Sequence, residues 1–255
     1  MAYTQTQLDG NLLDAVFMDD LRWVKESIAA GANVNAATGQ GGNTALHIVA
    51  DHTSRPNAAK ICETLLNIGA DITIRNKAGQ TPLHKAAMRD NIPVATAMLE
   101  VGANPNIRNA DEWTPLHSAL AAAQYSLAKL LLEAGADVNA VGTDKQSPLR
   151  KAMGHHPSPS FLCVYMLLTA GATITPELID DLNRQSAGRG DYLKSILDGT
   201  TKRPTPTEAC LDMEKRNASL TKLGLAQASK PVLGKYTNAA EHQRQAALDD
   251  PEQGI

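Results

Sequence analysis

The chain has 255 residues, enough to bury a sizeable core, and its hydrophobic (43%) and charged (20%) fractions are ordinary for a soluble protein. Its net charge of −3 gives no general attraction to nucleic acid or anionic membranes, so neither is expected as a partner. No apolar run approaches the roughly 18–20 residues that a transmembrane helix needs, and the first residues lack a signal-peptide pattern. We therefore expect a cytoplasmic protein that acts as a monomer.

Internal repetition is the strongest feature of the sequence. A "GA" dipeptide recurs with its glycine at Gly31, Gly69, Gly102, Gly135 and Gly171, which gives spacings of 38, 33, 33 and 36 residues. A second marker, the Thr or Ser that opens a "TPLH"-like motif, recurs at Thr44, Thr81, Thr114 and Ser147, with spacings of 37, 33 and 33. Because two independent markers share a period of 33 residues, the sequence predicts stacked repeat units.

The copy "TPLHKAAMRD" at residues 81–90 shows how one unit is built. Thr81 is expected to cap a helix, and Pro82 suits the first helical position, where a missing N–H costs nothing. The apolar residues that follow recur with helical spacing. "VATAMLEVGA" predicts a second helix, which Gly102 ends in a left-handed conformation. The residues between this helix and the next Thr predict a projecting finger.

The motifs "G-x-T-P-L-H-x-A-A" and "L-L-x-x-G-A-D-V-N" resemble those of the ankyrin repeat over about residues 11–175. The resemblance implies an all-α solenoid of stacked antiparallel helix pairs. It also implies projecting β-hairpin or loop fingers that point toward a concave side. In function, it implies a non-enzymatic module that binds a protein partner.

We expect about five repeats and a degenerate C-terminal cap within residues 1–199. The expected bounds are about 8–36 for the N-terminal cap repeat, 40–73, 77–106, 110–139 and 143–175 for the next repeats, and 176–199 for the degenerate cap. Trp23 is expected in the core of the first repeat. The apolar residues expected to form the last helix pair are Leu178, Ile179 and Leu182 on its first helix and Tyr192, Leu193, Ile196 and Leu197 on its second. The polar residues 200–255 predict a tail that is partly helical or disordered. In an alternative interpretation, the protein is an adaptor or a secreted bacterial effector, and this tail engages a second partner or secretion machinery.

Three histidines, His47, His84 and His117, occupy the same place in successive units, where the fourth unit of this pattern has Arg150. A catalytic histidine needs a nucleophile and an orienting carboxylate beside it, whereas these residues lie in different repeats. The resemblance implies that each His fixes a finger through hydrogen bonds to the Thr and nearby backbone. Because Arg150 departs from the motif, we expect the finger of its unit to be held most weakly. The residues expected to have such structural roles are Thr44, His47, Thr81, Pro82, His84, Thr114, Pro115, His117, Gly69, Gly102 and Gly135.

No pattern in the sequence predicts a catalytic residue, a cofactor or a metal ligand. The phosphate-binding loop, the dinucleotide fingerprint, the zinc-protease motif and the serine-hydrolase elbow are all missing. The three cysteines form no C-x-x-C pair; Cys62 and Cys163 align with core positions of second helices, and Cys210 lies in the tail. The adjacent His155 and His156 favour an exposed polar turn over a metal site.

The positions at which the units differ are the candidates for binding a protein partner. At the finger tips and the inner face of the first helices, these positions are Gln40, Asn43, Asp51, His52, Lys77, Gln80, Met88, Arg89, Asp111, Trp113, Asp144, Gln146 and His155, with Phe17 and Met18 in the cap. Trp113 either faces the groove as the centre of binding, together with Met88 and Arg89, or packs against neighbouring fingers. The mixed charges do not predict a strongly charged partner.

Overall fold

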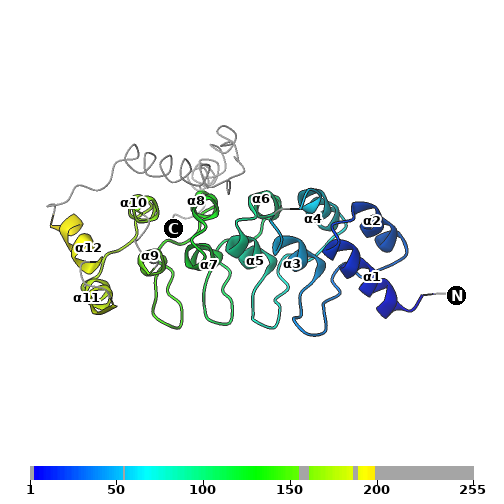
Figure 1. Ribbon diagram of the computed structural model, residues 1–255, viewed down its shortest axis with the longest axis horizontal. Helices are drawn as coiled ribbons and strands as arrows, with labels where there is room; N and C mark the ends of the chain where they lie inside the picture. Colours follow the sequence, from blue (N-terminus) through cyan, green and yellow to red (C-terminus); the bar gives the residue numbers. More distant parts are fainter. Residues whose placement is uncertain (1–2, 54, 155–160, 186–188, 199–255) are drawn as a thin grey trace, which may run out of the picture.

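The computed structural model describes residues 3–53, 55–154, 161–185 and 189–198 (Figure 1). Over these ranges the chain forms twelve α-helices, and none of them is both long and apolar enough to cross a lipid bilayer. The predicted tail at 200–255, and the adaptor role that depends on it, lie outside the described residues and stay predictions. His155, His156 and Cys210 also lie outside them.

The helices form two rows (Figure 1). The first helices of the units are α1 (Gln5–Phe17), α3 (Ala45–Ala50), α5 (Pro82–Arg89), α7 (Pro115–Ala121), α9 (Pro148–Met153) and α11 (Pro176–Gln185). The second helices are α2 (Leu21–Ala29), α4 (Ala58–Asn67), α6 (Ile92–Glu100), α8 (Tyr125–Glu133), α10 (Phe161–Thr169) and α12 (Arg189–Leu197). Each first helix packs on the next, and α2, α4, α6 and α8 pack in the same order. This stack of helix pairs is the predicted solenoid.

Four long loops, at 30–44, 68–81, 101–114 and 134–147, are the fingers; each joins a second helix to the next first helix. They project to one side of the stack, below the row of first helices in Figure 1. Within the described residues the fingers contain no β-strand, and a single backbone bridge joins Ala37 to Thr44. Of the two predicted forms, the fingers therefore take that of loops.

The helix ends follow the sequence signals. Thr81 and Thr114 are extended residues at helix N-termini, and Pro82 and Pro115 occupy the first helical positions. The glycines of the "GA" dipeptides all have φ between 86° and 96°, and Gly102 has a φ of 91°. Only glycine adopts this backbone without strain, which explains why each second helix ends there.

The core lies between the two rows of helices. Its repeated members are Leu46, Leu83, Leu116 and Leu149 in the first helices and Ile61, Val94, Leu127 and Cys163 in the second helices, all at most 2% exposed. Cys62 is also fully buried, which raises the pKa of its thiol to about 12 and makes it a poor nucleophile. The prediction for Trp23 needs a correction: Val24 fills the core position, and Trp23 packs partly buried against it.

The predicted last helix pair is present as α11 and α12, which pack on each other. Leu178, Leu182 and Leu193 are buried and Ile179 is partly buried, as expected for an apolar face directed at the stack. The side chains of Tyr192, Ile196 and Leu197 lie outside the described part of the structure. Helix α11 also contacts α9, so the pair continues the solenoid beyond the last recognisable "TPLH"-like motif.

Candidate protein-binding surface

The fingers and the exposed side of the first helices form one continuous surface, which we call the finger–helix surface. Backbone hydrogen bonds join neighbouring fingers: the Lys77 amide donates to the Gly41 carbonyl over 3.0 Å, and the Thr143 amide donates to the Asp111 carbonyl over 3.1 Å. Contact is also close at Gly79, where an added Cβ would lie 2.5 Å from the Ala110 nitrogen. The fingers therefore stack as a connected layer.

Two asparagines shape the fingers from within. The Asn76 side-chain oxygen accepts from the amides of Ala78 and Gln80, both over 3.0 Å. Asn109 repeats this in the next finger, accepting from the amides of Asp111 and Trp113 over 2.9 Å. These bonds replace the missing strand ladder, because a short polar side chain satisfies amides that would otherwise need a partner. Neither asparagine was predicted from the sequence, although the two lie one period of 33 residues apart and each begins a turn.

Each of the three histidines joins two units. The Nδ1 atom of His84 accepts from the Thr81 amide over 3.2 Å and lies 2.9 Å from the Thr81 hydroxyl. Its Nε2 atom lies 2.9 Å from the carbonyl oxygen of Trp113, at the base of the next finger. Since Nδ1 accepts, Nε2 carries the hydrogen and donates it to this carbonyl.

His47 and His117 repeat the arrangement, with Nε2 at 2.9 Å from the Gln80 carbonyl and at 3.0 Å from the Gln146 carbonyl. All three imidazoles are fully buried, and burial lowers the pKa of each, that of His84 to about 4. Both nitrogens of every ring are engaged within the fold. The geometry is that of a scaffold and leaves no ring nitrogen for a substrate or metal.

Arg150 takes a different partner from the histidines. Its Nε donates to Asp181 Oδ2 on α11 over 2.5 Å, and its side chain is only 8% exposed. The expectation that the finger of its own unit is weakly held is wrong, because His117 of the preceding unit holds that finger at Gln146. Arg150 instead contacts the unit that follows, where its ion pair with the partly exposed Asp181 takes the place of the histidine bond.

The predicted contact residues are all on this surface, apart from His155, which lies outside the described residues. The exposed ones are Gln40, Lys77, Arg89, Asp111 and Asp144, and the half-buried ones are Asn43, Asp51, His52, Gln80, Met88, Trp113 and Gln146. Several already have a partner within the chain: Lys77 Nζ donates to the Gly39 carbonyl over 2.8 Å, and Asn43 accepts from Asn76 over 2.9 Å. These bonds hold side chains in place on the surface.

Trp113 is packed between its neighbours. Its ring stacks on His117 with centroids 6.3 Å apart, and the Lys151 ammonium lies 3.6 Å from the ring centroid. An added Cβ at Gly142 would lie 2.6 Å from its Cδ1, so the next finger abuts the ring edge. The indole nitrogen is buried and lies near the Asp144 carboxylate, without a hydrogen bond of good geometry. These contacts match the packing alternative, and Trp113→Ala would remove all of them.

Lys151 connects this cluster to the last finger. Its ammonium donates to Asp144 Oδ2 over 2.9 Å while it covers the Trp113 ring. Burial tends to raise the pKa of Asp144, but the hydrogen bond and charge of Lys151 outweigh burial and lower it. Lys151 and its counterpart Lys85 were not among the predicted contact residues. Both follow the His position directly, and Lys85 lies one helical turn before Met88 and Arg89, a spacing that places it on the same face.

A second group of charges lies on α3 and α5. Arg89 Nε and Lys85 Nζ lie 2.9 Å and 3.7 Å from the same oxygen of Asp51. Burial tends to raise the pKa of Asp51, but the hydrogen bond from Arg89 and the two positive charges outweigh burial and lower it. The part of the finger–helix surface formed by α3 and α5 therefore carries charged side chains that are paired with one another.

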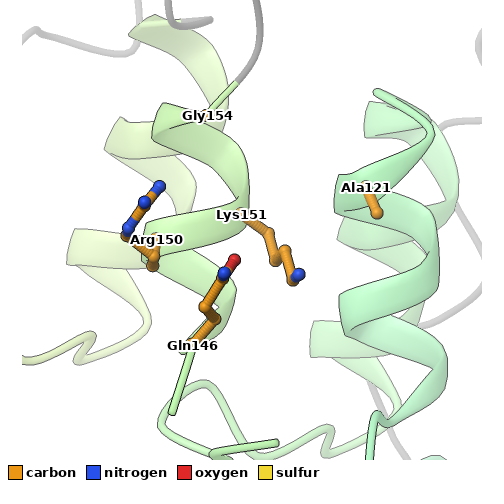
Figure 2. A pocket seen from close by; sticks show the side chains of 5 residues that line it. All are labelled: Ala121, Gln146, Arg150, Lys151 and Gly154. Carbon is orange, nitrogen blue, oxygen red and sulfur yellow. The ribbon is translucent and has the colours of Figure 1, made fainter. Parts of the chain in front are cut away.

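Between α7 and α9 the surface is hollowed. A cavity of about 180 Å³ is lined by Ala121, Gln146, Arg150, Lys151 and Gly154. Figure 2 shows Lys151 and Gln146 pointing into the space between the two helices, whereas Arg150 runs along the side of α9 away from Ala121. The hollow exists because the small Ala121 and Gly154 stand where the preceding units carry larger side chains. Across the described ranges, no three His, Cys, Asp or Glu side chains gather closely enough to hold a metal ion.

Comparison with known proteins identifies the architecture. The sequence model for ankyrin repeats, in three copies, matches residues 12–109 and 52–142, together about half of the chain. A stretch of 71 residues is 38% identical to the Neurogenic locus Notch protein of Drosophila melanogaster, covering 28% of this chain and 2% of that protein. A stretch of 89 residues is 36% identical to Rabankyrin-5 of Homo sapiens, covering 32% of this chain and 7% of that protein.

The chain thus spans only a small part of the length of these relatives. The match to the family model, in contrast, covers the repeats in which the histidine bonds and stacked fingers lie. The chain belongs to the ankyrin-repeat family, whose repeats mediate interactions between proteins and are not enzymes.

Proposed function

We propose that the finger–helix surface binds a protein partner and that the protein acts as a non-enzymatic interaction module. One observation carries this proposal: the buried positions repeat from unit to unit, while the surface positions differ. At the position four residues after the histidine, successive units carry Asp51, Met88, Ala121 and Gly154. A fold needs repeated core residues, but it does not need this variation on one face, which suits the recognition of a particular partner.

The bonds between units support the proposal energetically. Side chains on a rigid frame lose little conformational freedom on binding, so more of the contact energy appears as affinity. The histidine bonds and the finger-to-finger backbone bonds provide such a frame. A surface that spans several fingers and first helices also suits the roughly 800 Å² that each partner buries in a standard interface.

Within this surface, we propose a centre of binding other than Trp113. Trp113 is covered by His117 and Lys151, whereas Arg89 is more than half exposed and the hollow beside Ala121 is open. Hollows that accept a partner side chain are common centres of binding energy. We therefore place the centre of the interface over α5, α7 and α9, with Met88 and Arg89 on one side of the hollow.

The proposal is tested by filling the hollow with an uncharged side chain. Ala121→Gln should release partners that the wild-type protein captures from cells in which it is made. Ala134→Gln, at an exposed position after the second helix α8, is the matched control and should keep them. Thermal melting establishes that both variants are folded. Capture that is equal for wild type, Ala121→Gln and Ala134→Gln would show that partners bind elsewhere.

A further inference from the structure

Three cations gather at the N-terminal end of the finger–helix surface. Lys85 and Arg89 share Asp51. Arg55 is close enough that its charge, after burial, lowers the pKa of His52. Asp19 is the other carboxylate whose charge acts on the pKa of His52, and its Oδ2 accepts a hydrogen bond from the Asn57 amide over 3.0 Å. Two cations thus share the single carboxylate of Asp51, and Arg55 adds a third cation beside His52, so an incoming carboxylate meets cations that Asp51 only partly neutralises.

Within the described residues, the terminal N–H groups of Arg89 have no hydrogen-bond partner. Its side chain is 54% exposed, and within the described part of the chain only its Nε is bonded, to Asp51. The terminal N–H groups of a guanidinium form a planar fork that matches a carboxylate. Because Asp51 already fixes one side of Arg89, the fork is oriented before any partner arrives.

An exposed apolar surface adjoins these cations. Phe17 and Met18, at the end of α1, are 51% and 67% exposed. The Phe17 ring lies edge-on to His52 with centroids 5.7 Å apart, and the Arg55 guanidinium lies 5.1 Å from the ring centroid. Arg55 also donates to the Phe17 carbonyl, which keeps the guanidinium beside the ring. We call Phe17, Met18, His52, Arg55, Lys85 and Arg89 the basic–apolar corner.

We propose that the basic–apolar corner recognises an acidic segment of the protein partner, in which an Asp or Glu lies close to a large apolar residue. The inference rests on the proposed function, since the corner is part of the finger–helix surface. The carboxylate of the segment binds the free fork of Arg89 and the Lys85 ammonium, and its apolar side chain covers Phe17 and Met18. A basic segment is repelled from the same place, so the corner also selects against partners of the wrong charge.

The test starts from short random peptides displayed on phage and selected on the full chain. We expect the recovered peptides to be enriched in Asp or Glu beside Leu, Phe, Ile or Met. Arg89→Gln should weaken binding of a recovered peptide roughly tenfold or more, since it removes the paired charge. Lys129→Gln is the matched control, because Lys129 is 63% exposed on the second helix α8, away from the corner; it should leave affinity unchanged.

A charge exchange makes the test independent of folding defects. Arg89→Glu should lose the acidic peptide and gain affinity for the same peptide with its acidic residue replaced by Lys. Recovery of no peptides, recovery without acidic enrichment, or equal affinity of wild type and Arg89→Gln would overturn the inference. Peptides that lack acidic residues but are lost with Ala121→Gln would leave the proposed function standing, whereas peptides insensitive to both variants would count against both.

Discussion

At the scale of single residues, the histidine row shows how a reactive side chain becomes part of a scaffold. His84 is fully buried, accepts at Nδ1 and donates at Nε2, so its neutral form satisfies groups in two units at once. Protonation would turn Nδ1 from an acceptor into a donor and set it against the Thr81 amide. The low pKa of His84 therefore keeps the imidazole in the neutral form that its structural role requires.

Replacing His84 tests this role. His84→Ala leaves the Thr81 amide and the Trp113 carbonyl without their partner, so we expect the free energy of unfolding at neutral pH to fall by about 1–2 kcal/mol. Urea denaturation measures this free energy of unfolding. His52→Ala, at a half-exposed position outside the row, serves as the control and should change stability less. An unfolding curve for His84→Ala that coincides with that of the wild type would contradict the scaffold role.

The same residue predicts a pH dependence. The folded-state pKa of His84 is about 4 and its ordinary value is 6.5. Between these values the unfolded chain binds a proton that the folded chain does not, so stability falls as the pH drops from 6.5 to 4. For His84 the loss amounts to about 3 kcal/mol at pH 4, and His47 and His117 shift in the same direction. Unfolding free energies measured across this range should fall more steeply for the wild type than for His84→Gln; parallel curves would refute the assignment.

At the scale of elements, the sequence predicts what depends on neighbours along the chain. Thr81 with Pro82 starts a helix and Gly102 ends one because capping and backbone conformation are local. The burial of Cys163 followed from its alignment with Val94 and Leu127 in other repeats.

Side-chain ion pairs between units could not be predicted from the sequence. Asp51 and Arg89 are 38 residues apart, and Arg150 and Asp181 are 31 apart. Such pairs depend on how one unit stacks on the next and on the rotamers of long side chains. Lys151 could not be placed over Trp113 for the same reason. The candidate surface was thus predicted in outline from the positions that vary, whereas the hollow beside Ala121 and the cations around Asp51 needed the structure.

The link between α9 and α11 gives a prediction at this scale. Asp181→Asn leaves the buried Arg150 charge without its partner, so we expect the last helix pair to loosen and stability to fall by about 1–2 kcal/mol, less than for a fully buried pair because Asp181 is partly exposed. Amide hydrogen exchange in α11 and α12 should become faster. Asp180→Asn changes the exposed neighbour and should have little effect. Equal exchange rates in the two variants would mean that the ion pair does not hold the helices.

At the scale of the whole molecule, the protein is a stack in which one row of helices supports the other. The second helices supply core residues, while the first helices and fingers share a connected layer of hydrogen bonds and carry the candidate positions that differ between units. This division places a rigid and varied surface on one side of the molecule. The central claim is that a protein partner binds on that side.

Hydrogen exchange of the full chain, alone and bound to a captured partner, tests this claim most directly. On binding, we expect slower exchange in the fingers and in α3, α5, α7 and α9, with little change in α4, α6 and α8. Slower exchange confined to the second helices, with the fingers and first helices unchanged, would contradict it.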